Sequence, residues 1–241
     1  MVPCLWTEAT AGRSSDNILS TFYRFLTFYK DVPTIVLWLD NCASQNKNWS
    51  FFAFLILLLN SDETDSKTIV LKYFESGHTF MSADSFHAAV EKRMKKSPPV
   101  TFPDFEEVVS QAKNKVEVLE MRTEDFVQTS ISVSQYTLNQ LSPRPYIEEI
   151  RLVKIEKGSL NFNYTDNTAS SDDQLLSCSL FSKKQRKAIA ENNFKFSKTL
   201  RRQTVAAGIN AERKKSLMDI IFPLIDEDKK LFWETLPTKV E

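Results

Sequence analysis

The sequence predicts an α/β fold, because strand-like and helix-like segments alternate over residues 1–97. Two short segments, Thr34–Leu39 and Thr68–Phe74, are rich in apolar and β-branched residues and are bounded by turn-forming residues. A long apolar helical pattern lies between them. Strands that are separated by a helix pair in parallel through a right-handed crossover, so we expect these two strands to be neighbours in one sheet.

Three helices are expected around these strands. The first is amphipathic, since Ile18, Phe22 and Leu26 recur at every fourth position. The second contains the apolar run Phe51–Leu59, which is too short to cross a membrane and therefore indicates a buried helix. The third ends before two consecutive prolines. Their predicted ranges are 14–29, from 46 or 50 to 59, and 83–96.

The pattern changes after residue 97. A helix at Asp104–Lys113 and a strand at Val116–Met121 are expected, and Ile147–Ile155 and Leu160–Tyr164 predict a hairpin around Gly158. The segment up to residue 181 is rich in serine and aspartate, which is typical of a linker. The predicted division is therefore a core at 1–97, an α+β extension at 98–164, a linker at 165–181, and a basic segment with C-terminal helices at 182–241.

The composition excludes several function classes. The four glycines lie far apart, so neither a dinucleotide-binding nor a P-loop glycine motif can be present. The three cysteines form no C-x-x-C pair, and the two histidines form no H-E-x-x-H motif. Basic and acidic side chains number 31 each, so global charge indicates no partner. The sparse, odd cysteine count suits a reducing compartment, and we expect a nuclear or cytoplasmic protein without a membrane segment.

A dense polar loop follows the first predicted strand. Asp40 ends the strand next to Asn41, and Gln45, Asn46 and Lys47 lead into the second helix. In open α/β sheets, ligands bind beyond the carboxyl ends of the strands, where Asp40 is expected. A desolvated carboxylate there needs a cation or several hydrogen-bond donors. The alternative is that Asp40 and Asn41 only shape the turn and cap the helix.

A second group of candidates follows the second predicted strand. His78 lies in a glycine-containing loop directly after it. On the next helix, Asp84, His87 and Glu91 share one face. Asp84 is the preferred ligand because it is nearer the strand ends, although it could simply cap the helix, and His87 is interpreted as a half-buried helix residue. Carboxylates such as Asp40 and Asp84, on neighbouring elements, suit Mg²⁺ or Mn²⁺ ions that clamp a phosphodiester.

Two blocks, Asp40-Asn41-Cys42 with Gln45-Asn46-Lys47-Asn48 and Gly77-His78-Thr79-Phe80-Met81 with Asp84 and Glu91, carry a resemblance. They resemble a multicopy family of transposon-derived proteins with an RNase H-like, DDE-type integrase core. The resemblance implies an ancestral metal-dependent phosphodiester cleavage or strand transfer. Asp40 and Asp84 would be the metal ligands, with Glu91 as the alternative to Asp84, and His78 would lie near the scissile phosphate.

The resemblance also implies a carboxylate that the chain lacks. The first acid of such a core stands on its opening strand, within a three-stranded meander that precedes the first helix. Here Leu5-Trp6-Thr7-Glu8 leads directly into the first predicted helix, and Glu8 belongs to the wrong strand. We therefore expect an RNase H-like core that is incomplete at its N-terminus, in a truncated gene product or an inactive derivative, without catalysis.

Positive charge concentrates in residues 182–215, where eleven Lys and Arg face two Glu, a local excess of nine. Lys183, Lys184, Arg186 and Lys187 open this segment. Such a segment can neutralise phosphates while the interleaved Phe181, Phe194 and Phe196 pack or stack; the alternative is a solvated helix face. For nucleic-acid contacts we expect these four cations and, in the polar loop, Asn41, Gln45, Asn46 and Lys47. Two function classes remain: a transposase-derived protein that binds DNA or RNA, and a non-catalytic protein-interaction module of domesticated transposon origin.

Overall fold

The chain folds into a mixed α/β structure with a mixed sheet, which confirms the α/β prediction. The computed structural model describes residues 1–74, 81–129, 145–166, 174–190, 196 and 200–239. It divides into two compact units. The sheet unit comprises Ser14–Thr79 and Val127–Arg201, and the terminal unit comprises Met1–Arg13, Phe80–Phe126 and Arg202–Glu241.

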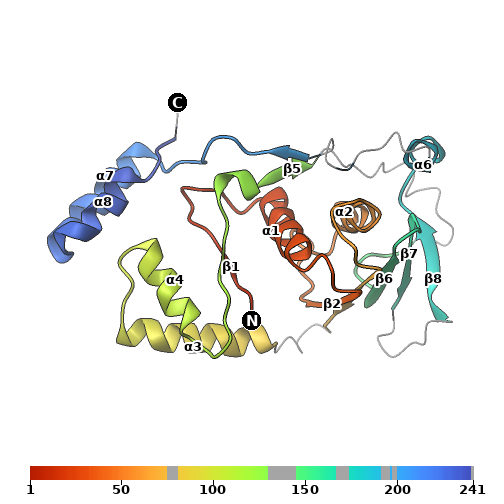
Figure 1. The fold of residues 1–241 in the computed structure, drawn as a ribbon, viewed down its shortest axis with the longest axis horizontal. Coiled ribbons are helices and arrows are strands. Elements are labelled where there is room, and N and C mark those ends of the chain that lie inside the picture. The colour runs from red at the N-terminus through yellow and green to blue at the C-terminus, as the bar shows by residue number, and fades with distance from the viewer. Residues whose placement is uncertain (75–80, 130–144, 167–173, 191–195, 197–199, 240–241) are drawn as a thin grey trace. The chain divides into compact units, whose positions relative to one another are not determined.

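A five-stranded sheet with the order β2-β3-β6-β7-β8 organises the sheet unit (Figure 1). β2 and β3 pair in parallel, as predicted, and all the other pairs are antiparallel. β2 therefore forms one edge of the sheet and β8 the other. The strands are β2 (Thr34–Leu39), β3 (Thr68–Tyr73), β6 (Leu152–Glu156), β7 (Asn161–Thr165) and β8 (Leu176–Ser179).

Two helices pack against one face of this sheet. α1 (Ser15–Phe28) begins at Ser14, whose hydroxyl accepts the Asn17 backbone N–H. α2 (Trp49–Leu59) is capped by Asn48 and crosses β3, β6 and β7, and every residue of the run Phe51–Leu59 is buried. A helix that is apolar on all sides needs cover on all sides. No helix in the described part of the chain combines the length and apolar character that crossing a membrane requires.

The cover on the outer side of α2 comes from distant segments. Leu180, Phe181 and Phe196 join the same apolar core as α1 and α2, and the Phe196 ring lies 5.7 Å from that of Phe54. β5 (Val127–Thr129) pairs with β9 (Leu200–Arg202). The buried hydroxyl of Ser20, on α1, accepts the Val127 N–H at 2.9 Å. The core is therefore complete only when both ends of the segment Val127–Arg201 pack against α1 and α2.

The other face of the sheet is open along β2. Ile35 and Leu39 point into the core, whereas Val36 and Trp38 are 48% and 51% exposed. This alternation follows the period of two that a strand imposes on its side chains. A sheet with helices on one face only leaves apolar side chains of its edge strand in contact with solvent.

Short strands and helices build the terminal unit. β1 pairs in parallel with β4, and α3 packs on α4 through Phe86, Val90, Val108 and Val109. The elements are β1 (Cys4–Leu5), α3 (Ser82–Lys96), α4 (Phe102–Ser110), β4 (Leu119–Glu120), η1 (Thr123–Asp125), α7 (Ala211–Ile221), η4 (Phe222–Leu224) and α8 (Glu227–Thr235).

Asp104 ties α8 to α4 within the terminal unit. Its carboxylate accepts the backbone N–H of Thr101 and of Val100, and it forms an ion pair with Lys229 of α8. Burial by itself would raise the pKa of Asp104, but the hydrogen bonds from Lys229 and from the cap outweigh it and lower the pKa to about 2. The carboxylate therefore stays charged, and the tie persists, throughout the neutral range.

Two features of the organisation differ from the sequence-based division. β8 forms within the predicted linker, where Cys178 is buried against the sheet. The predicted hairpin of the extension forms as β6 and β7, but β6 pairs with β3 and so belongs to the same sheet as the predicted core. A division into contiguous segments could not include this pairing. β3 pairs with β2 along one edge, and β6, which is distant in the sequence, pairs along its other edge.

The burial of α2 predicts a large cost for truncating its side chains. We expect Phe54→Ala to lower the free energy of unfolding by about 3–5 kcal/mol, since a fully buried ring is replaced by a cavity. Phe28→Ala is the matched control, because Phe28 is 38% exposed, and it should cost less than about 1 kcal/mol. Urea unfolding followed by circular dichroism measures both, and equal losses would contradict the position given to α2.

Candidate functional site

The polar loop between β2 and α2 folds inward. Asn46 and Lys47 are 7% and 4% exposed, whereas Gln45 is exposed and Asp40 and Asn41 are half-buried. The Asn46 side-chain amide donates to the Asp40 carboxylate at 2.6 Å. Asn46 and Lys47, which were predicted to contact nucleic acid, are therefore buried in the loop, and Gln45 is exposed to solvent.

Lys47 links the ends of three elements. Its ammonium group donates to the Asn41 side-chain oxygen at 2.8 Å and to the Glu148 carbonyl at 3.0 Å, and it lies 4.9 Å from the centre of the Tyr73 ring. Asn41 in turn donates to the carbonyl of Phe74, at the end of β3. Burial of the amine, together with repulsion from Arg151, lowers the pKa of Lys47 to about 8, against an opposing attraction from Glu148.

One oxygen in this loop is buried without a partner. The Asn46 side-chain oxygen makes no hydrogen bond, although the Asn46 carbonyl accepts the Tyr73 hydroxyl at 2.6 Å. Burial raises the pKa of Tyr73, and the nearby Asp40 charge raises it further, so the phenol stays neutral and donates. A buried, unpaired oxygen costs about 1–3 kcal/mol, and it belongs to the same amide group whose nitrogen donates to Asp40.

The two predicted metal ligands belong to different compact units. Asp84 belongs to the terminal unit and Asp40 to the sheet unit. The Asp84 carboxylate accepts the Met81 backbone N–H at 2.6 Å, which is the helix-capping alternative. His87 and Glu91 are exposed on α3, so His87 is not half-buried as expected. His78 lies outside the described residues. Among the described residues, no three His, Cys, Asp or Glu side chains gather as a metal site.

An aromatic surface next to the loop was not predicted from the sequence. The exposed Trp38 ring lies 5.1 Å from that of Phe74, and the Lys72 ammonium group stands over the Trp38 ring at 5.1 Å. The three side chains come from the ends of β2 and β3, and Trp38 is two residues before Asp40. The alternation of side chains along β2 could have revealed Trp38, because it puts Trp38 on the face of the strand opposite to that of the buried Leu39. Lys72 lies beside Trp38 only because β2 and β3 pair in a register that sets these two residues side by side.

The basic segment forms an exposed helix at the other edge of the sheet. α6 (Lys183–Ala190) follows β8 directly, and its four basic side chains, Lys183, Lys184, Arg186 and Lys187, are all exposed. Ser182 caps the helix by accepting the Gln185 backbone N–H at 3.2 Å. The helix carries no acidic residue. The predicted cluster therefore exists as one cationic face.

Two further cations of the basic segment are engaged within the terminal unit. Arg213 pairs with Glu8 at 2.9 Å, and Lys214 donates to the carbonyls of Glu234 and Leu236, all within the terminal unit. Phe181 and Phe196 were expected to pack or to stack. Both are buried in the core of the sheet unit, so they pack, and the apolar requirement of α2 decides their position. Phe194 lies outside the described residues.

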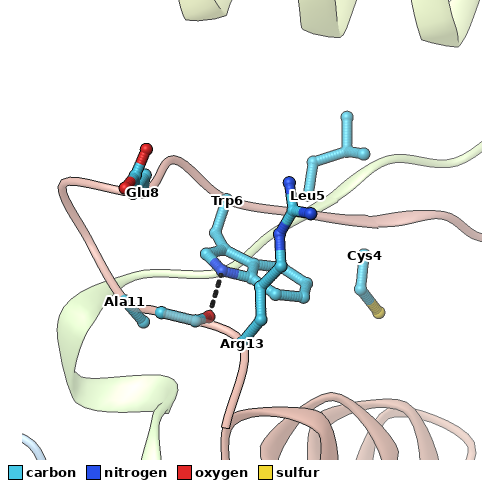
Figure 2. A pocket seen from close by; sticks show the side chains of 7 residues that line it. Cys4, Leu5, Trp6, Glu8, Ala11 and Arg13 are labelled. Atoms are coloured by element: carbon cyan, nitrogen blue, oxygen red, sulfur yellow. Dashed lines mark hydrogen bonds between the residues drawn. The ribbon is translucent and has the colours of Figure 1, made fainter.

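A pocket of about 600 Å³ lies along the N-terminal segment of the terminal unit (Figure 2). The Trp6 indole N–H donates to the Gly12 carbonyl at 3.2 Å and closes the turn that shapes it. Cys4, Glu8 and Arg13 contribute the polar groups. Glu8 is 64% exposed at its side chain and is paired with Arg213.

The sequence of the chain matches a known protein family. Residues 13–170, more than half of the chain, match the model of DUF7869, a domain of unknown function. The chain belongs to this family. The match runs from the residue before the α1 cap through β7. No curated protein and no solved structure matches the chain.

The depressed pKa of Lys47 predicts a stability that rises in alkaline solution. The folded lysine releases its proton near pH 8, whereas an unfolded lysine keeps it to about pH 10.4. Between these values the unfolded state binds more protons, so stability increases with pH, by an amount on the order of 2 kcal/mol. Urea unfolding at pH 7, 8.5 and 10 should show this rise in the wild type and not in Lys47→Met. The exposed Lys30 provides the control, since Lys30→Met should keep the rise.

Proposed function

We propose that this protein binds nucleic acid and descends from a transposase with an RNase H-like, DDE-type core, whose ancestral reaction was metal-dependent phosphodiester cleavage or strand transfer. The observation that carries the binding proposal is α6, where four exposed cations stand on one helix without an acidic neighbour in it. Clustered Lys and Arg that reach phosphates release counterions and so produce affinity without sequence preference. With DNA or RNA as its partner, the protein would act in the nucleus or cytoplasm.

The aromatic surface at β2 supports a second contact with unpaired bases. Trp38 is exposed and Lys72 stands beside it, which combines a stacking surface with a cation for the adjoining phosphate. Stacking of a base on an aromatic side chain is worth about 1–3 kcal/mol and tolerates any sequence. α6 follows β8 and Trp38 lies on β2, so the two contacts stand at opposite edges of the sheet.

The position of Asp40 supports the proposed ancestry. Asp40 directly follows β2, which pairs on one side with β3 and forms the edge of the sheet on the other. The resemblance to an RNase H-like core puts the second acid at the end of a strand, and Asp40 stands at the end of β2.

The ancestry implies Mg²⁺ or Mn²⁺ ions near Asp40. The Asp40 carboxylate and the unpaired Asn46 oxygen are hard oxygen donors of the kind that Mg²⁺ and Mn²⁺ prefer. A two-ion centre needs further carboxylates, and no such cluster exists among the residues that the structure describes. The described residues do not fit a two-ion centre, and we propose no catalytic step.

The alternative, a protein-interaction module, is favoured by one observation. Val36 and Trp38 are exposed on an edge strand that carries no charged residue, and such edges pair readily with an added strand. The two functions differ in what Trp38 does. If Trp38→Ala lowers affinity for single-stranded DNA about tenfold, the nucleic-acid function is supported. Unchanged affinity would favour the interaction module.

Binding to duplex DNA should depend steeply on salt. If each of the four α6 cations neutralises one phosphate, log K falls with log [salt] at a slope of about −3.6, a loss of roughly a hundredfold between about 50 and 200 mM. Replacing Lys183, Lys184, Arg186 and Lys187 with glutamine should remove most of this slope. Fluorescence anisotropy with a labelled duplex measures it.

A matched variant separates this site from general charge. Lys92, Lys95, Lys96 and Lys115 are exposed lysines of the terminal unit, and replacing all four with glutamine changes the net charge equally. This variant should keep the slope. Equal effects of both quadruple variants, or binding that salt does not change, would contradict a site at α6.

A nuclease assay tests separately whether the chain is inactive. We expect no Mg²⁺- or Mn²⁺-dependent nicking of supercoiled DNA by the chain. Nicking that depends on either ion and disappears in Asp40→Ala would contradict the proposed inactivity and would support a working enzyme. This outcome leaves the binding test at α6 unaffected, because Asp40 and α6 lie at opposite edges of the sheet.

A further inference from the structure

A pocket of about 370 Å³ lies at one end of the five-stranded sheet, within the sheet unit. This volume is at the lower end of the range for small-molecule sites. β6 begins and β7 ends beside the pocket, where Leu152 pairs with Thr165. β8 begins there as well, since Leu176 pairs with Tyr164. The described residues that line the pocket are Pro145, Tyr146, Glu149, Ile150, Tyr164, Thr165, Asp166, Gln174 and Leu176.

The pocket carries negative charge that no cation in the described part of the chain neutralises. Glu149 and Asp166 are exposed, and neither carboxylate has a hydrogen-bond or ion-pair partner among the described residues. No basic side chain is among the described lining residues. Arg151, two residues from Glu149, donates instead to the Glu148 carbonyl at 2.9 Å. The charge of the pocket therefore favours a cationic ligand over an anionic one.

Tyr164 adds a polar group that the fold leaves without a partner. Only 7% of this residue is exposed, and its hydroxyl makes no hydrogen bond with a described residue. The hydroxyl is not among the polar atoms that are both enclosed and unpaired, so it reaches the open space of the pocket that Tyr164 lines. A buried tyrosine usually finds a hydrogen-bond partner. A ligand with an N–H group would supply the missing one.

Tyr146 and Leu176 give the same pocket an apolar side. They are 70% and 51% exposed, and the Glu149 backbone N–H closes the turn at Tyr146 by donating to its carbonyl at 3.0 Å. An aromatic face attracts an ammonium or a guanidinium group, and an apolar surface suits the methylene stem that carries such a group. A bare metal ion would use the carboxylates but neither of these two side chains. The lining therefore fits an organic cation better than a metal ion.

We propose that this pocket binds a cationic group on an alkyl stem, such as the ammonium group of lysine or the guanidinium group of arginine. The charged end would contact the carboxylates of Glu149 and Asp166 and donate to the Tyr164 hydroxyl. The stem would pack on Tyr146 and Leu176. Two sources offer this chemistry, a free polyamine and the Lys or Arg side chain of another protein.

This site is independent of the proposed nucleic-acid binding. α6 follows the end of β8, whereas the pocket lies where β8 begins. Its carboxylates would repel phosphates. A failure of either proposal therefore leaves the other standing.

Isothermal titration calorimetry of the full chain tests the proposal with three probes. Spermidine and Nα-acetyl-lysine methylamide carry a cation, whereas Nα-acetyl-norleucine methylamide has an alkyl stem without charge. We expect a dissociation constant of about 1 mM for the lysine amide, because so small a ligand buries little surface, and binding of the norleucine amide at least about tenfold weaker. Tighter binding of spermidine than of the lysine amide would indicate a free polyamine, and the reverse would indicate a side chain of a partner. Equal binding of the lysine and norleucine amides, or no binding of either cation, would overturn the proposal.

Removing the two charges tests which residues form the site. Glu149→Gln combined with Asp166→Asn keeps the size of both side chains and should weaken the binding of both cations about tenfold or more. Asp62→Asn combined with Asp65→Asn is the matched control, because both residues are exposed and precede β3, at the opposite end of the sheet. This control changes the net charge equally and should keep the affinity. Equal losses in the two double variants would show that net charge alone attracts the cations, and the proposed site would be wrong.

The aromatic contact has its own test. Tyr146→Leu keeps an apolar side chain at an exposed position and removes the ring, so it should weaken the lysine amide about threefold. Circular dichroism of this variant and of both double variants should match the wild type, since all the substituted residues are exposed. An affinity for the lysine amide that Tyr146→Leu leaves unchanged would overturn the arrangement of the cation over Tyr146.

Discussion

The fold depends on the burial of α2 from every side. Its run of nine apolar residues, Phe51–Leu59, has no polar face to leave in water, so the sheet can cover only part of it. α1 covers a second part, and Phe181 and Phe196 return from far along the chain to cover the rest. This requirement explains why the sheet unit is discontinuous in sequence, and why its helices gather on one face and leave Val36 and Trp38 exposed on the other.

The polar loop before α2 is shaped by the same constraint. A chain that leaves the sheet at Asp40 and must enter a buried helix carries its polar groups inside, where each needs a partner. Asn48 caps the helix, Asn46 donates to Asp40, and Lys47 bridges Asn41 and the Glu148 carbonyl. Much of the amide-rich composition is therefore accounted for by local structure. The unpaired Asn46 oxygen is the part that local structure does not satisfy.

The neutral total charge conceals a strong local order. Lys183, Lys184, Arg186 and Lys187 collect on α6, which carries no acidic residue. The nucleic-acid binding proposed above rests on these four side chains.

The sequence by itself determined the local elements. Periodicity and turn residues predicted α1, β2, β3 and the β6–β7 hairpin, because these signals arise from neighbouring residues. Tertiary structure alone decided that β6 pairs with β3, that β8 forms within an apparent linker, and that Lys47 is buried while Trp38 is exposed. It also decided that Phe181 and Phe196 pack in the core rather than stack. The physical reason is that burial depends on which distant surfaces meet, and the residue pattern of one segment does not contain that information.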